Sequence, residues 1–352
     1  ANYEGALAAD AASIPALARL GAARSIAWLP DGRLSLRGQA RANILSLTIS
    51  DMRLTALDER YDGAVAVSAK GDGAATLTGS LAAEKINLDD FLSKAPPLVD
   101  ENGEWNKASI SLALPKGLDL DLRVSAATIS WRGHAIEDAA FSLMSADGGF
   151  KATLSEARAY KGALKGAAAA VPGPEGGAQL SVSASLANAD IGAMLAEFGA
   201  NSYSGIGDLE VAVRSNGASV ADFARGLSGD ASVKLGAGVI DGLSLEEALR
   251  RSERRPINIF TDMRTGRTNF DEAAARAAIS KGEARLLSGV ATGPGVYVSL
   301  SGTADLANRE LATQLVATRA DQHGAPEPEG PQLKMTIVGP WSRPIIRSGS
   351  GA

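Results

Sequence analysis

Strict alternation of apolar and polar side chains is the feature that most constrains what this chain can fold into. Between residues 118 and 124, Leu118, Leu120, Leu122 and Val124 are apolar and every residue between them is charged. Successive side chains of a strand point to opposite faces, so this period of two predicts a strand with one apolar and one polar face. Such strands are typical of antiparallel sheets that are solvated on one side.

The same alternation recurs along the whole chain and predicts a mainly β fold. Short turn signals separate the alternating stretches, as expected of a meander of many short strands. The other alternating stretches are residues 110–114, 180–184, 209–213, 296–300 and 333–337. The turn signals are residues 30–32, 62–63, 147–149, 215–217 and 293–295.

Short helices interrupt the predicted strands. Ser219 with Asp222, and Ser244 with Glu247, have the spacing of a capping box, in which two residues satisfy the free amide groups at a helix start. A third helix is predicted from the helical spacing of four apolar residues, with Gly199 as its C-cap, and a weaker one over residues 87–94. The four apolar residues are Ile191, Met194, Leu195 and Phe198.

Similar groups of residues return after roughly 100 positions. Trp28, the Tyr61–Gly63 triplet and Leu92 are followed in the same order by Trp131, the Tyr160–Gly162 triplet and Leu195. We interpret this as a duplicated unit of sheet plus helix, which lets a sheet grow along one axis. The predicted division is residues 1–125, 126–225 and 226–352. Residues 321–331, rich in proline and glycine, are predicted to form a surface loop.

Composition excludes several classes of function. The chain of 352 residues has no cysteine, which removes thiolate catalysis, cysteine-ligated zinc and disulfides. A net charge of −5 and a pI near 5.3 give no electrostatic basis for nucleic-acid binding. No apolar run is long enough to predict a transmembrane helix. The first residues have neither an initiator methionine nor a signal-peptide pattern, so we expect an excised piece whose anchor or export signal lies upstream.

The candidate chemical groups do not converge on a site. His134 and His323 are far apart in sequence, and we expect both to be solvated loop residues rather than ligands or bases. The glycines near Gly238 lack the spacing and the βαβ context of a dinucleotide fingerprint. The pairs Asp119/Asp121 and Asp89/Asp90 lack the features of a calcium loop. We therefore predict that the protein is not an enzyme and needs neither metal nor cofactor.

One basic cluster has two interpretations. Arg250, Arg251, Arg254 and Arg255 are favourable at a helix C-terminus ahead of Pro256. Contact with a phospholipid headgroup or membrane surface is the alternative.

From residue 226 onward, a series of short motifs appears in a specific order. The succession resembles the C-terminal region of the AsmA family of bacterial envelope proteins, in which similar motifs follow one another. The resemblance covers residues 226–344 and extends more loosely to the upstream repeats. The motifs are Gly226–Val233, Gly238–Leu245, Thr268–Asp271, Ser280–Ala284, Gly293–Gly295, Leu300–Leu306 and Val338–Pro344.

This resemblance implies a bridge-like lipid transfer protein, with a long curved antiparallel sheet built from repeats and a few short capping helices. It also implies a periplasmic location, an inner-membrane anchor upstream, and a role in phospholipid transport and outer-membrane assembly. The expected partners are phospholipid or another acyl lipid, the inner and outer membranes and other envelope proteins. Helix propensity favours a helix over the alanine-rich residues 270–279, whereas the resemblance implies a turn and a strand there, which we adopt.

The apolar strand positions are the candidate lipid-binding residues. If the apolar face is open, we expect these residues to line a lipid-binding groove. A large exposed apolar strip without a ligand would promote aggregation, so an open face implies a bound ligand. The alternative is a structural or regulatory envelope protein whose β core is closed and carries no lipid. The predicted groove residues are Leu118, Leu120, Leu122, Val124, Leu180, Val182, Leu209, Val211, Val213, Val296, Val298 and Leu300.

Overall fold

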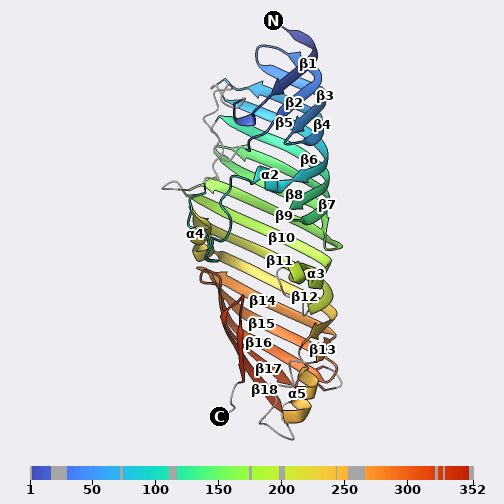
Figure 1. The fold of residues 1–352 in the computed structure, drawn as a ribbon, viewed down its shortest axis with the longest axis vertical. Coiled ribbons are helices and arrows are strands. Elements are labelled where there is room, and N and C mark those ends of the chain that lie inside the picture. The colour runs from blue at the N-terminus through green and yellow to red at the C-terminus, as the bar shows by residue number, and fades with distance from the viewer. Residues whose placement is uncertain are drawn as a thin grey trace. The chain divides into compact units, whose positions relative to one another are not determined.

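The structure is a computed structural model that describes most of the chain. The described residues are 2–16, 30–71, 74–110, 117–173, 177–197, 203–242, 244–252, 266–321, 324–327 and 330–348. Their strands belong to one mixed sheet of 19 strands, and their helices are few and short (Figure 1). The prediction of a mainly β protein with a few short helices is therefore confirmed.

Contacts divide the chain into two compact units. The N-terminal unit comprises residues 1–159, 164–183 and 216–223, and the C-terminal unit comprises residues 160–163, 184–215 and 224–352. The division into three segments that the sequence repeats predict is a different partition, and it stays a prediction.

The strands β1 to β8 of the N-terminal unit stand side by side in chain order, and most neighbours are antiparallel (Figure 1). Several hairpins close with two-residue turns in which both residues have positive φ, as at Leu57–Asp58 and Arg132–Gly133. Such turns match the twist of the flanking strands. The strands are β1 (Tyr3–Ala11), β2 (Leu34–Ala42), β3 (Ser46–Ala56), β4 (Glu59–Ala69), β5 (Ala75–Asn87), β6 (Leu118–Trp131), β7 (His134–Ala146) and β8 (Gly149–Ala159).

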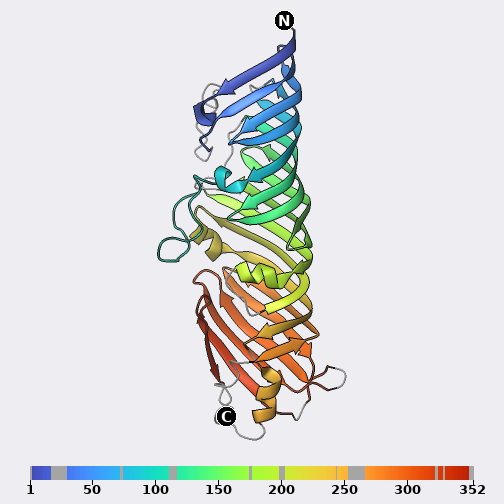
Figure 2. The same cartoon turned by 45° about the vertical axis from the view of Figure 1, so that its right-hand side comes forward.

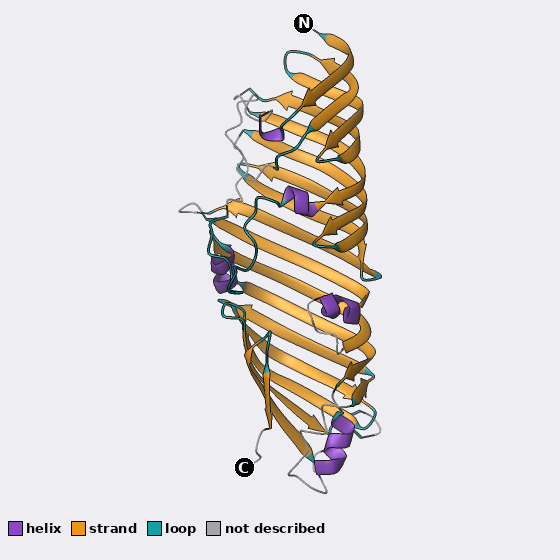
Figure 3. Ribbon diagram, viewed as in Figure 1, coloured by secondary structure: helices purple, strands orange, loops and turns teal. Residues whose placement is uncertain are grey.

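One pair in this unit departs from the predicted antiparallel order. Strands β5 and β6 pair in parallel, with Leu77 opposite Leu120 and Leu81 opposite Val124. Parallel neighbours cannot be joined by a tight turn, so the chain crosses over between them. The crossover begins with α2 (Leu88–Phe91), which Figure 3 shows in purple beside the strands. The sheet, predicted to be antiparallel, is therefore mixed, because this pair is parallel.

Residues 62–63, predicted to form a turn, lie inside β4 instead. A Cβ added to Gly63 would stand 2.0 Å from the carbonyl oxygen of Ser80, so only glycine fits there. The neighbouring strand β3 has a register shift between Ile49 and Met52, and Asp51 has a φ of 48°. An irregularity of this kind bends a strand without ending it.

Three strands contribute residues to both units. They are β9 (Gly162–Pro172), β10 (Ala178–Asp190) and β11 (Tyr203–Gly217), and the helices beside them are α3 (Ile191–Glu197) and α4 (Val220–Gly226). Half of the capping box predicted for α4 is present: the amide of Asp222 donates to Ser219 Oγ at 3.1 Å, and the Asp222 carboxylate accepts the amide of Ala218 at 3.3 Å. The predicted helix over residues 191–198 is confirmed as far as Glu197; Phe198 and its cap Gly199 lie outside the described residues.

The C-terminal unit is antiparallel from β11 to β19. The alanine-rich segment forms a strand, as the family resemblance implied and propensity alone did not. Figure 2 shows α5 (Leu245–Ser252) across one end of the strands of this unit. The strands are β12 (Ser228–Asp241), β13 (Arg267–Phe270), β14 (Glu272–Ser280), β15 (Glu283–Gly293), β16 (Val296–Asp305), β17 (Glu310–Thr318), β18 (Gln332–Pro340) and β19 (Ile345–Ser348).

Candidate functional site

The apolar residues of β3 to β8 line up in rows across the N-terminal unit. Directly paired residues of neighbouring strands point to the same face, so each row of pairs lies on one side of the sheet. We call these rows together the N-terminal apolar face. The outer row is Leu47, Val67, Leu77 and Leu120; the middle row is Ile49, Val65, Gly79, Leu122 and Leu143; and the inner row is Met52, Gly63, Leu81, Val124, Phe141 and Leu154.

Exposure on this face falls from one end of the strands to the other. On β6, Leu118 is 36% exposed, Leu120 and Leu122 are half-buried, and Val124 is 7% exposed. The inner row is covered because Phe91 of α2 and Ile14 pack against the cluster that contains Val124. The face therefore has a sealed end beneath the helix and a partly exposed end at the outer row.

The opposite face of the same strands is polar. Asp121, Arg123 and Ser125 alternate with the apolar residues of β6 and are exposed. Asp62 of β4 also points to this side, where it lies 2.9 Å from Arg60 and 3.6 Å from Arg53. The hydrogen bond from Arg60 lowers the pKa of the Asp62 carboxyl below its usual value. This face is therefore a solvated surface, as the alternation predicted.

In the C-terminal unit, the predicted residues of β11 lie opposite small side chains. Leu209 pairs with Val233, which pairs with Ala275, and Val211 pairs with Ala231, which pairs with Ala277. We call the side of the sheet that carries these rows the C-terminal apolar face. Leu209, Val211 and Val213 are all half-buried; Leu180 and Val182 are half-buried too, but they lie in the part of β10 that belongs to the N-terminal unit.

The predicted residues of β16 lie at the covered end of the C-terminal apolar face. Val296 is 3% exposed and belongs to a cluster with Leu245 and Leu249 of α5, which are 2% and 1% exposed. Val298 packs against this cluster, whereas Leu300 is half-buried opposite Leu315. The start of α5 is fixed because the amide of Leu245 donates to Thr268 Oγ1 at 3.0 Å.

Burial thus divides the twelve predicted residues. Val124 and Val296 sit in sealed clusters and Val298 packs against one, while Leu118 is exposed at an edge. The remaining eight are half-buried. Whether any of them contacts lipid stays a prediction.

The polar candidates have structural partners. Asp119 pairs with Lys70, the carboxylate of Asp89 accepts the amide of Arg132, and Arg250 pairs with Glu247. Gly238 lies within β12, paired with Gly205 and Phe270, rather than in a phosphate-binding loop. Among the described residues there is no group of three His, Asp or Glu side chains that could hold a metal ion. His323, Arg254 and Arg255 lie outside the described residues, as does the side chain of Arg251.

Sequence reasoning missed the residues of β3 to β5 on the N-terminal apolar face. Alternation is visible there, at Leu47 and Ile49 and again at Leu77 and Leu81, but Gly63 and Gly79 interrupt it.

Sequence reasoning also missed the crossover segment, residues 92–110, which runs from α2 to the start of α4 (Figure 3). This segment is fixed by backbone bonds from Ala221 to Asn106 and from Ile110 to Ala218.

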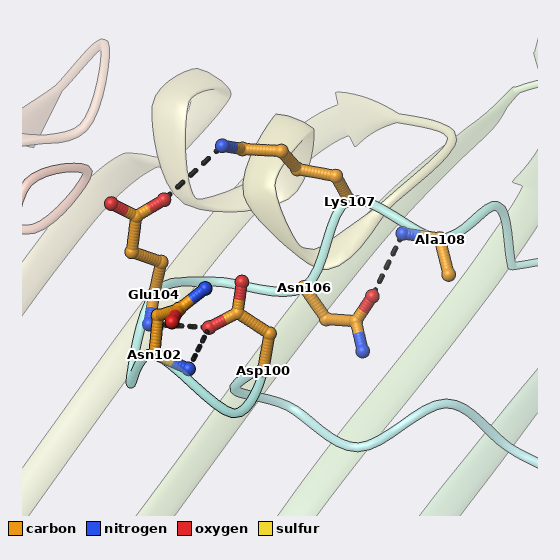
Figure 4. A network of polar contacts seen from close by, with 6 residues as sticks. All are labelled: Asp100, Asn102, Glu104, Asn106, Lys107 and Ala108. Carbon is orange, nitrogen blue, oxygen red and sulfur yellow. Dashed lines mark hydrogen bonds and ion pairs between the residues drawn. The ribbon is translucent and has the colours of Figure 1, made fainter.

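Polar contacts shape the middle of the crossover segment (Figure 4). The Asp100 carboxylate accepts the amides of Asn102 and Glu104, both at 2.9 Å, and Lys107 pairs with Glu104 at 3.2 Å. The Asn106 side chain accepts the amide of Ala108 at 2.8 Å. These contacts are local and shape the backbone, so they are structural.

The sequence model of the AsmA family matches residues 98–288, which is more than half of the chain. The chain belongs to the AsmA family. Comparison with curated proteins and with solved structures finds no match. The AsmA match overlaps the motif region, residues 226–344, over residues 226–288. It begins well upstream of that region, at residue 98. No helix in the described part of this AsmA-family chain is long and apolar enough to cross a membrane.

Proposed function

We propose that this AsmA-family chain binds the acyl chains of phospholipid on its apolar sheet faces. It does so as the periplasmic part of an inner-membrane-anchored protein that assists phospholipid transport and outer-membrane assembly. The observation that carries the proposal is the exposure gradient on the N-terminal apolar face. Leu, Ile and Val side chains are aligned over β3 to β7, yet the outer row and, apart from the buried Ile49, the middle row are only partly buried by the described residues.

The physical argument is one of surface free energy. Each methylene group withdrawn from water contributes about 0.8 kcal/mol, so a row of aliphatic side chains is a favourable surface for an acyl chain. The rows run across the strands, which lets a linear ligand contact one residue of each strand in turn. We further propose that the protein is a carrier rather than an enzyme, since its apolar rows bring no nucleophile, acid or base to the ligand.

A second candidate is a structural or regulatory envelope protein without lipid cargo. The sealed clusters beneath α2 and α5 favour it, because they show that parts of both faces serve as ordinary hydrophobic core. The two candidate functions make different predictions for the half-buried rows: the first predicts contact with lipid, and the second predicts none.

Substitution of Leu122 by Glu separates the candidates. If the middle row contacts lipid, the carboxylate meets acyl methylenes, and the bound phospholipid falls at least about tenfold because an unpaired charge is costly in an apolar site. The melting temperature stays close to that of the wild type, since the half-buried carboxylate can reach water. Native mass spectrometry of co-purified phospholipid and a thermal melt measure the two effects.

Two further substitutions on the same strand serve as controls. Ser125→Glu adds the same charge to the polar face and leaves both lipid and melt unchanged. Val124→Glu places the charge in the sealed cluster and lowers the melting temperature strongly. A wild-type protein that carries no phospholipid, or a Leu122→Glu protein that melts like Val124→Glu, would favour the structural candidate.

A further inference from the structure

The turn between β2 and β3 displays two large aliphatic side chains. Ile44 is 90% exposed and Leu45 is 63% exposed. Tyr3, which is 51% exposed, lies nearby because it pairs with Ala42 at the end of β2. The Tyr3 hydroxyl donates to the Ala6 carbonyl at 2.9 Å, so its ring lies back along β1, and the large side chains at the turn itself, at this corner of the N-terminal unit, are Ile44 and Leu45.

Hydrogen bonds hold this turn in a defined shape. The Asn43 side chain accepts the amides of Leu45 and Ser46, both at 2.8 Å, and the Asn43 amide donates to the Ser46 carbonyl at 2.8 Å. The Leu45 carbonyl accepts the amide of Ala69 at 2.7 Å. Paired backbone groups can leave water at low cost, whereas unpaired ones cannot enter an apolar phase.

The charged side chains near this corner are neutralised in pairs. Arg41 lies 2.8 Å from Glu4, and Lys70 pairs with Asp119. These four charged groups therefore add no net charge to the corner, and its exposed side chains at the turn are aliphatic. This chemistry suits the interface of a zwitterionic bilayer and gives no preference for an anionic surface.

The turn also continues into the N-terminal apolar face. Leu45 bonds to Ala69, Ala69 pairs with Ala75, and Ala75 pairs with Leu118. These four residues form a rim row on the same side of the sheet, next to the outer row. Leu45 and Leu118 in this rim row are both exposed. The partly exposed end of the face and the exposed turn are thus one apolar surface.

We propose that the turn at residues 43–46 inserts Ile44 and Leu45 into the interface of a phospholipid bilayer and sets the open end of the N-terminal apolar face against the acyl chains. A stable protein partner would need about 800 Å² on each side, which two side chains at a hairpin tip cannot supply. Insertion into a bilayer needs only these side chains. The inference rests on the proposed lipid function for its purpose, but it can fail separately.

Vesicle binding tests the insertion. The double substitution Ile44→Ser with Leu45→Ser is expected to lower co-sedimentation with phosphatidylcholine vesicles at least about fivefold, because two aliphatic side chains no longer leave water. The melting temperature is unchanged, since both side chains are exposed. Leu287→Ser is the matched control: Leu287 is 65% exposed but lies within β15, so its loss leaves vesicle binding intact.

A probe at the turn gives a direct readout. The natural chain has no cysteine, so Ile44→Cys can be labelled with an environment-sensitive fluorophore at a single site. Adding phosphatidylcholine vesicles shifts its emission to the blue, while the same label at Leu287→Cys does not respond. Equal responses at both sites, or none at residue 44, overturn the inference.

The two proposals fail in different ways. A Leu122→Glu protein that still binds vesicles but carries no phospholipid supports both. A wild type that binds vesicles through the turn but never carries phospholipid keeps the insertion and rejects the lipid function. A wild type that carries phospholipid but binds vesicles no better than the double variant keeps the lipid function and rejects the insertion.

Discussion

The two apolar faces share one plan but differ in the size of the side chains that line them. On the N-terminal face, Leu, Ile and Val dominate β3 to β7. On the C-terminal face, β14 contributes Ala273, Ala275 and Ala277, and Ala275 lies opposite Gly289 of β15. Alternation fixes which side of a strand is apolar, whereas side-chain volume sets how far the surface stands from the backbone. Similar patterns therefore produce a thick lining over β3 to β7 and a thin one over β14 and β15.

The covers of the two faces differ as well. In the N-terminal unit, α2 has four residues, and its Leu88 and Phe91 are only partly buried. In the C-terminal unit, α5 has eight residues, and its Leu245 and Leu249 are almost completely buried. The longer helix forms a core of its own with β16 to β18, so the C-terminal unit depends more on its helix.

The largest expected effect on stability comes from a substitution that removes part of the contact between α5 and strands β16 to β18. Leu249→Ala should lower the free energy of unfolding of the C-terminal unit by about 2–5 kcal/mol, because a buried leucine leaves a cavity. Phe91→Ala in α2 should cost less than Leu249→Ala, since Phe91 is only partly buried. Chemical denaturation of both variants measures the difference, with the exposed Glu246→Ala as a control; a larger loss for Phe91→Ala would reverse the comparison.

A smaller effect tests whether the thin lining is open. Ala273→Leu adds volume at a half-buried position and should change the free energy of unfolding by less than about 0.5 kcal/mol. Ala317→Leu adds the same volume at a residue that is 0% exposed in the α5 cluster, and should cost about 1–3 kcal/mol. Equal costs in denaturation experiments would mean that both positions are core.

The smallest effect concerns two tyrosines, one in each unit. Burial raises the pKa of Tyr61 to about 12, and burial together with a hydrogen bond to Glu197 raises the pKa of Tyr160 to about 12. The folded state favours both neutral phenols, so their stabilising contribution is constant below pH 10 and is lost as the pH rises through about 12.

Glu197→Gln distinguishes the two causes. It removes the carboxylate beside Tyr160 and should lower the pKa of Tyr160 partway, while Tyr61 keeps its value. The phenolate absorbance of the wild type and the variant, recorded during an alkaline titration, measures both. A change in the pKa of both tyrosines would show that the Glu197→Gln substitution alters the structure beyond the surroundings of Tyr160.

Much of the fold could be predicted because alternation is a local signal. Strands β6, β10, β11, β16 and β18 each contain a predicted alternating stretch. The alanine-rich β14 has no such signal, and only the family resemblance indicated it. The parallel pairing of β5 with β6 was not predictable, because a strand's own residues do not specify its partner or the partner's direction.

The candidate site could be predicted only in part. Alternation shows which residues share a face, and Leu118 to Val124 do share one. It does not show what covers that face, so the sequence could not separate Val124, which is buried in the cluster that Phe91 packs against, from the exposed Leu118. At Gly63, a strong local turn signal misled, because the close approach of the Ser80 carbonyl inside the sheet requires the same residue as a turn.

The parallel junction between β5 and β6 has a consequence for how the N-terminal unit assembles. Strands β2 to β5 pair with their nearest neighbours in sequence, so they can form as soon as they leave the ribosome. Strand β6 joins them only after the 88–117 part of the chain has been synthesised, which requires the closure of a long loop. Until then the edge of β5 is unpaired and open to the wrong strand. Substitutions that weaken this junction should therefore reduce the yield of folded protein before they reduce the stability of what has folded.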